Sequence, residues 1–149
     1  MASPRIRPAT QDDRARIEEI VEAAYTPWAE LIGARPLPMD ADYTALIDAG
    51  HVFVTGDGPH GVIVLIPEDG ALLVENVAVA PDRHGRGLGG ALLAFAEDHA
   101  RALGLPGLRL YTNELMTSNI ARYERLGYRE TGRQDIGGRY VIHMSKPLG

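Results

Sequence analysis

Apolar residues near the start of the chain recur at helical spacing. Positions 17, 20, 21 and 24 are all aliphatic and lie three or four residues apart, as on one face of a helix. The pattern predicts a helix that begins after Thr10, a residue type that caps helices, and runs to about Tyr25. Prolines and glycines interrupt the next stretch, where one helical turn over residues 28–32 and a short helix over residues 42–48 are predicted.

The rest of the chain alternates between strand-like and helix-like patterns. Short apolar runs bounded by turn residues predict strands, and longer amphipathic runs predict helices. The predicted strands are residues 6–8, 51–55, 61–66, 71–79, 107–112, 128–134 and 139–146, and the later helices are residues 89–103 and 117–126. The strand–helix–strand order over residues 71–112 implies a parallel pair with a right-handed crossover. We therefore expect a single α+β domain over residues 1–149 with a mixed sheet.

Composition narrows the function classes. The chain has 149 residues, a formal net charge of −5 and no cysteine. The lack of thiols excludes a disulfide framework, a thiolate metal site and a cysteine nucleophile, and no metal site is predicted. The acidic balance argues against a nucleic-acid partner. No run is long and apolar enough for a membrane span or signal peptide, so a cytoplasmic location without a membrane partner is expected.

Residues 81–93, PDRHGRGLGGALL, are the most informative segment. They place Gly85, Gly87, Gly89 and Gly90, with Arg83, His84 and Arg86, between a strand-like run and an amphipathic helix. Glycine lets the backbone approach a ligand closely, and the first N–H groups of a helix have no acceptor within it. These features predict a site for a phosphate or pyrophosphate. The alternative is a glycine-rich surface turn with two solvated arginines.

The same glycines also allow a different nucleotide site. Gly85, Gly87 and Gly90 have the G-x-G-x-x-G spacing of dinucleotide-binding loops, and Glu114 lies about 20 residues further on. However, residues 80–84 separate the strand from the glycines, and only 59 residues follow Gly90. That is too few for the rest of a doubly wound sheet, so a dinucleotide-binding oxidoreductase is disfavoured.

The segment resembles the acyl-CoA loop of the GCN5-related N-acetyltransferase (GNAT) family. That family has Gln/Arg-x-x-Gly-x-Gly/Ala at the start of its central helix, after a strand ending in an Ala-Val-x-Pro-like step. Residues 78–81 here read Ala-Val-Ala-Pro and residues 84–89 read His-Gly-Arg-Gly-Leu-Gly, with His84 where Gln or Arg is usual. Residues 123–128, Tyr-Glu-Arg-Leu-Gly-Tyr, resemble the family's helix-end motif. The resemblance implies a three-layer fold with a mostly antiparallel sheet of about seven strands and helices on both faces.

The resemblance further implies acetyl-CoA as the cosubstrate. The residues expected to bind it are Val77, Ala78, Val79, His84, Gly85, Arg86, Gly87, Leu88, Gly89, Gly90 and Asn119. The backbone of residues 77–79 would pair with the pantetheine and polarise the thioester carbonyl, while the glycine loop, with Arg83 and Arg86, would hold the phosphates. Asn119 would replace an Asn that the family often has where Met116 stands here. Helix capping by Ser118 or Thr117 is the alternative.

Two residues are candidates for catalysis. In the family a Tyr at the position of Tyr123 faces the cofactor sulfur, so Tyr123 is expected to protonate that sulfur as it leaves. A core tyrosine is the alternative. Glu75 interrupts an apolar strand, and because desolvation disfavours the charged form of a carboxylate, Glu75 is a candidate general base. An ion pair or a solvated bulge is the alternative. His143 is more simply a core histidine than a catalytic one.

The acceptor side is expected to come from the irregular N-terminal part. Tyr25, Trp28, Ile32, Arg35 and Tyr43 would form either a lid over the acyl end or ordinary packing against the sheet. Arg35 favours an acceptor with a carboxylate, whereas the acidic total favours a cationic amine, so the acceptor is not determined.

The leading hypothesis is an N-acetyltransferase that acts on a primary amine of a small molecule or peptide. Because no cysteine can carry the acetyl group, direct transfer in a ternary complex is expected. A non-catalytic acyl-CoA-binding sensor or partner module is the alternative. A homodimer through the terminal strands is implied only by the family resemblance.

Overall fold

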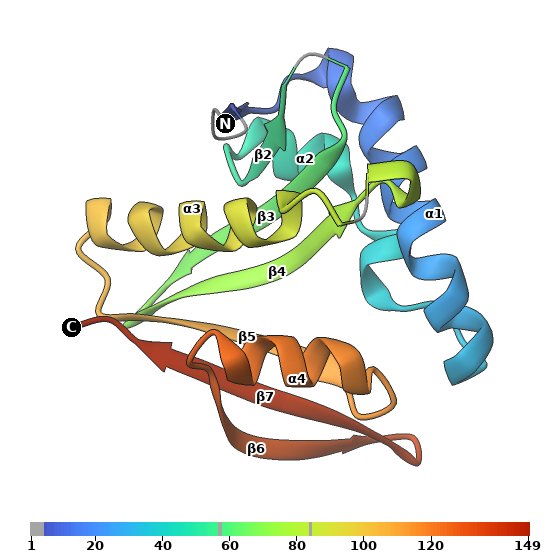
Figure 1. Cartoon of the computed structure of the whole chain (residues 1–149), viewed down its shortest axis with the longest axis vertical. Helices are drawn as coiled ribbons and strands as arrows, with labels where there is room; N and C mark the ends of the chain where they lie inside the picture. Colours follow the sequence, from blue (N-terminus) through green and yellow to red (C-terminus); the bar gives the residue numbers. More distant parts are fainter. Residues whose placement is uncertain (1–4, 57, 84) are drawn as a thin grey trace. The chain divides into compact units, whose positions relative to one another are not determined.

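The computed structural model describes residues 5–56, 58–83 and 85–149 (Figure 1). Its strands are β1 (Ile6–Pro8), β2 (Val52–Thr55), β3 (Gly61–Glu68), β4 (Ala71–Val79), β5 (Gly107–Asn113), β6 (Arg129–Ile136) and β7 (Arg139–Pro147). Its α-helices are α1 (Arg14–Ile32), α2 (Tyr43–Asp48), α3 (Leu88–Ala102) and α4 (Thr117–Arg125). Short 3-10 turns are η1 (Gln11–Asp13), η2 (Leu37–Asp40) and η3 (Pro81–Arg83). None of the helices described is both long and apolar enough to cross a membrane.

The strands form one mixed sheet in the order β1-β2-β3-β4-β5-β7-β6. β4 and β5 are parallel, with Leu72 opposite Leu108, whereas the pairs β1–β2, β2–β3, β5–β7 and β6–β7 are antiparallel. The predicted α+β class, seven-stranded mixed sheet and parallel crossover are therefore confirmed.

The described residues fall into two compact units. The first comprises the described parts of Met1–Ile66 and Val74–Ala96. One face of its strands packs against α1 and α2 through a buried apolar cluster; its members are Ile17, Ile20, Val21, Tyr43, Ile47, Val52, Val54, Val62, Val64, Ala78 and Ala80. The other face meets α3, where the Phe53 and Phe95 rings lie 4.9 Å apart. Successive side chains of β2 and β3 point to opposite faces of the sheet, so both faces are buried in this unit.

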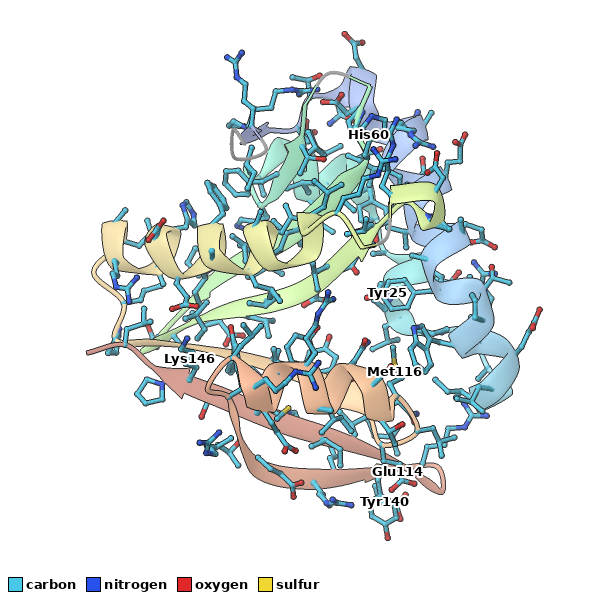
Figure 2. All side chains as sticks on the ribbon, viewed as in Figure 1. Tyr25, His60, Glu114, Met116, Tyr140 and Lys146 are labelled. Carbon is cyan, nitrogen blue, oxygen red and sulfur yellow. The ribbon has the colours of Figure 1, made fainter. Side chains whose placement is uncertain are left out.

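The second unit comprises Pro67–Leu73 and Glu97–Gly149. Leu108, Leu110, Ile142 and Met144 are buried along β5 and β7. Met116, labelled in Figure 2, receives a hydrogen bond on its sulfur from the Thr112 hydroxyl at 3.5 Å. The end of α3 is fixed to β7 by an ion pair of 3.0 Å between Glu97 Oε2 and Lys146 Nζ. Both side chains are largely shielded from solvent.

Helix α1 extends beyond its predicted end at Tyr25, through Pro27 to Ile32. Pro27 has no N–H, so the carbonyl of Ala23 loses its usual helical donor. The Thr26 hydroxyl donates to the carbonyl of Glu22 at 2.6 Å within this distorted turn. Gly33, with φ +79°, ends the helix in a left-handed conformation. The predicted separate turn over residues 28–32 is therefore wrong, because it continues α1.

Asp13 anchors the entry to α1. Its carboxylate accepts two hydrogen bonds from the Arg7 guanidinium, at 2.8 and 2.9 Å, and one from the Thr10 N–H at 2.8 Å. The hydrogen bonding to Arg7, which outweighs the opposing effect of burial, lowers the pKa of Asp13 from 3.8 to about 2.

We expect Asp13→Asn to lower the free energy of unfolding by about 2 kcal/mol at pH 7, since each pKa unit corresponds to about 1.4 kcal/mol. Because the folded-state pKa is depressed, this contribution is complete well above the unfolded-state pKa and is lost as the pH falls toward 2. About half should remain at pH 3. Urea unfolding of both proteins at pH 7, 5, 4 and 3 measures this. A difference that stays constant with pH would contradict the assignment.

Candidate functional site

The chain turns from β4 into α3 through a loop whose glycines have left-handed backbones. Gly85 has φ +79° and Gly87 has φ +77°, conformations that side-chain-bearing residues rarely adopt. The Ala91 N–H donates to the Gly87 carbonyl at 3.0 Å. Leu88, Gly89 and Gly90 form the first turn of α3, and the N–H groups of a first turn have no acceptor within their own helix. Such an arrangement can bind an anion, and the anion site stays a prediction.

Arginines flank this loop. The Nε of Arg83 is buried and has no hydrogen-bond partner among the described residues. The same Nε forms an ion pair with Asp82 Oδ2 at 4.0 Å. Arg86 is exposed. His84, the third predicted side chain here, lies outside the described residues.

β4 presents two different faces. Glu75, Val77 and Val79 are half-buried on one face, whereas Asn76 and Ala78 are buried on the other, toward α1 and α2. The sequence correctly placed Glu75 with Val77 and Val79. Glu75 is close enough to Tyr43 for its charge to help raise the pKa of that tyrosine, although burial is the larger cause.

Asn76 is the centre of a hydrogen-bond chain that the sequence did not reveal. The Tyr25 hydroxyl donates to Asn76 Oδ1 at 2.7 Å, and Asn76 Nδ2 donates to the Tyr43 hydroxyl at 3.0 Å. The Tyr43 hydroxyl in turn donates to the Pro38 carbonyl at 2.6 Å. Tyr25, labelled in Figure 2, also has its hydroxyl 3.4 Å from the Val77 carbonyl oxygen. The only available signals were two tyrosines in an irregular segment and one Asn in an apolar strand.

Tyr123 is buried on α4 in the second unit. Its ring packs edge-on against Tyr128, with centroids 5.7 Å apart. Burial raises the pKa of Tyr123 to about 12, against a smaller opposing effect of Arg122. No described residue hydrogen-bonds to the Tyr123 hydroxyl. The Tyr128 hydroxyl is buried and likewise lacks a partner within the described part of the chain.

Asn119 lies one turn before Tyr123 and is half-buried. Its N–H donates to the Met116 carbonyl at 3.1 Å, at the first turn of α4. Met116, at the position where the resembling family often has Asn, is 5% exposed and contributes to the core.

Arg35 is engaged by acidic residues of the protein itself. Its guanidinium pairs with Glu22 at 3.1 Å and with Asp40 at 3.0 Å. The charge of Arg35 is therefore balanced by the protein itself, and its recognition of an acceptor carboxylate stays untested.

His143 lies on β7 beside Tyr111, with ring centroids 6.0 Å apart, and its Nε2 is 3.2 Å from Gln134 Oε1. It helps to line a cavity of about 300 Å³ in the second unit. The charged groups of this cavity, Arg109 and Arg133, already hold Glu68 and Glu130. Among the residues described, no group of three His, Asp or Glu is arranged to hold a metal ion.

The first unit thus brings together the glycine loop, the end of β4, Glu75 and the Asn76 chain. Tyr123 and Asn119 belong to the second unit.

Comparison with known proteins agrees with these features. Residues 48–130, more than half of the chain, match the model of the acetyltransferase (GNAT) domain. The chain is 36% identical over 90 residues to the IAA acetyltransferase of Azospirillum brasilense, covering 59% of each protein. It is 40% identical over 75 residues to the mycothiol acetyltransferase of Streptosporangium roseum, covering 50% of this chain but 20% of that protein. The chain therefore spans less than two thirds of these relatives.

Two full-length similarities complete the picture. The S-(2-succino)cysteine N-acetyltransferase of Bacillus subtilis is 28% identical, covering 97% of this chain and 96% of that protein. The crystal structure of a GCN5-related N-acetyltransferase from Rhodopseudomonas palustris superposes with a TM-score of 0.81 at 20% identity, covering 99% of this chain and 98% of that one. The family match agrees with the seven-stranded mixed sheet and with the left-handed glycines after β4. The chain therefore belongs to the GNAT family of acetyltransferase domains.

Proposed function

We propose that the protein transfers an acetyl group from acetyl-CoA to a primary amine. The observation that carries this proposal is the β4–α3 loop, in which two glycines with positive φ lead directly into the first turn of a helix. This loop would suit a pyrophosphate. The buried Nε of Arg83 makes no hydrogen bond within the described part of the chain and would supply a further donor for a phosphate oxygen. The proposed contacts to acetyl-CoA further include Arg86, His84 and Asn119.

The acyl end is assigned to β4. Backbone groups of residues 77–79 would bind the pantetheine and stabilise the negative charge that develops on the thioester oxygen. Glu75 shares the half-buried face with Val77 and Val79, where it would take a proton from the acceptor ammonium, directly or through water. The freed amine would attack the carbonyl carbon in a ternary complex, and the C–S bond would break as Tyr123 donates its proton to the leaving sulfur. The nitrogen would then lose its second proton, which leaves a neutral amide and restores the Tyr123 phenol by way of solvent.

A cationic small molecule is the acceptor class that charge favours. Residues 11–50 hold nine of the 20 acidic residues and three of the 15 basic ones. Those three arginines are paired, Arg14 with Glu18, Arg16 with Glu19 and Arg35 with Glu22 and Asp40. A suitable panel of acceptors is spermidine, phenethylamine, S-(2-succino)cysteine and a lysine-containing peptide. Acetyl transfer to each is measured as the release of free CoA thiol. The third of these is the substrate in the name of one relative.

Ligand-dependent melting tests the loop. Acetyl-CoA at about 100 times its Kd should stabilise the protein by about 2.7 kcal/mol and raise Tm by a few degrees, whereas NAD(H) should not. Gly87→Ala should abolish that rise, because alanine in a left-handed conformation distorts the loop. Gly137→Ala, at φ +62° in the turn between β6 and β7, is the matched control.

Both glycine variants should lose about 1–2 kcal/mol of intrinsic stability from backbone strain. Only Gly87→Ala should lose the acetyl-CoA shift. A wild-type shift with NAD(H) alone would overturn the proposed function and favour a dinucleotide site. An acetyl-CoA shift without acetylation of any panel amine would instead favour a non-catalytic acyl-CoA-binding module.

Tyr123→Phe should lower kcat by about 10²–10⁴, as expected for loss of a general acid, with little change in Tm. Tyr128→Phe is the control, since it removes a neighbouring buried hydroxyl while keeping the ring; its kcat should stay unchanged. Because the pKa of Tyr123 is about 12, the wild-type activity should show no loss from its ionisation below pH 11. Equal kcat values for Tyr123→Phe and the wild type would remove Tyr123 from the mechanism.

Glu75→Gln should lower kcat/KM for the amine by about 10²–10⁴, because the amide cannot accept the ammonium proton. Glu68→Gln, which changes a carboxylate paired with Arg109, is the matched control and should keep the wild-type kcat/KM. Initial rates with saturating acetyl-CoA and varied amine give the comparison. An unchanged kcat/KM in Glu75→Gln would assign proton removal to another group.

A further inference from the structure

A segment of twelve residues that begins within α1 and ends at the start of η2 has no buried side chain. We define residues 26–37 as the lid segment; it comprises the end of α1 after Tyr25 and the turn that leads into η2. All its side chains are at least partly exposed, and Leu31 and Leu37 are 56% and 69% exposed. The helix α1 and partial burial hold part of this segment, but none of its residues belongs to the buried core cluster.

Polar contacts hold the two ends of this segment. Tyr25 directly precedes it and Pro38 directly follows it, and these two residues are the ends of the hydrogen-bond chain through Asn76. The bonds run in one direction, from the Tyr25 hydroxyl to Asn76, from Asn76 to Tyr43, and from Tyr43 to the Pro38 carbonyl. Asn76 itself is 4% exposed, and its bond to Tyr43 is buried while its bond to Tyr25 is partly buried, so competition from water is reduced.

The other contacts across the lid segment are weaker constraints. Arg35 pairs with Glu22 and Asp40, but these three side chains are 49% to 62% exposed. Ion pairs at such exposed positions contribute little to stability and are screened by salt. The chain through Asn76 is therefore the stronger restraint on both ends of the segment.

The same chain reaches the strand proposed to hold the acyl group. Asn76 directly precedes Val77, and the Tyr25 hydroxyl lies 3.4 Å from the Val77 carbonyl oxygen. A shift of the lid segment that broke this chain would also change the surroundings of the Val77 backbone.

We propose that Asn76 is a positioning residue that ties both ends of the lid segment to β4 and thereby orients the acceptor amine toward the acyl group. This inference rests on the proposed acetyl transfer for its functional part only. The tether itself acts whether or not the protein is an enzyme. Asn76 touches neither reacting atom and acts through Tyr25 and Tyr43.

Hydrogen exchange measured by mass spectrometry tests the tether directly. Tyr25→Phe and Tyr43→Phe each keep the ring and remove one hydroxyl of the chain. Each should raise amide exchange in residues 26–37 by about tenfold while exchange in residues 61–66 of β3 stays unchanged. Tyr140→Phe, which removes an exposed hydroxyl in the second unit, is the matched control and should change neither segment.

Kinetics then test the positioning role. With the panel amine of highest kcat/KM, both variants should raise KM for the amine by about tenfold, while the Kd of acetyl-CoA stays within about twofold. In an Asn76→Ala background, Tyr25→Phe should have no further effect on KM, because its partner is already absent.

The outcomes separate the two proposals. If the wild type transfers acetyl groups but the variants keep both the amine KM and the lid exchange rates, the tether is wrong. It is also wrong if exchange rises equally throughout the first unit, since that indicates general destabilisation. If the wild type acetylates no panel amine, the proposed function fails, and the exchange pattern alone decides the tether.

Discussion

The site depends on how β4 ends. Its backbone must leave the sheet at Val79 and start a helix at Leu88, and the two left-handed glycines at 85 and 87 provide that change of direction. A side chain at either position would be strained, so the loop that exposes the N–H groups of α3 requires glycine. The proposed anion site and the start of α3 both depend on this one backbone constraint.

The alternation of β4 assigns separate tasks to its two faces. The buried face joins the core and carries Asn76, which holds α1 and α2, while the half-buried face carries Glu75 beside the backbone proposed to bind the acyl group. A one-residue shift in register would exchange these faces and bury the carboxylate. The buried apolar neighbours of Asn76 and its three-bond chain both resist such a shift.

Most of the fold could be predicted from the sequence, because the spacing of apolar residues indicates which face of each helix or strand is buried. The strand over residues 71–79 and the short helix before Gly50 were readable from local pattern alone. The end of α1 was not, because Pro27 normally stops a helix and only the structure shows that α1 continues past it. The Asn76 chain was not predictable either. Its partners Tyr25 and Tyr43 lie 51 and 33 residues away, and hydrogen bonds between distant residues leave no periodic signal.

The buried state of Tyr123 limits how it can act. A free thiol has a pKa of about 8.5, so a phenol with a pKa of about 12 holds its proton more tightly by about 5 kcal/mol. Complete transfer to a solvated sulfur anion would therefore be uphill. Desolvation also raises the proton affinity of the leaving sulfur, which reduces this difference. In the proposed role, a buried Tyr123 would therefore be suited to a concerted step, in which the proton moves as the C–S bond breaks.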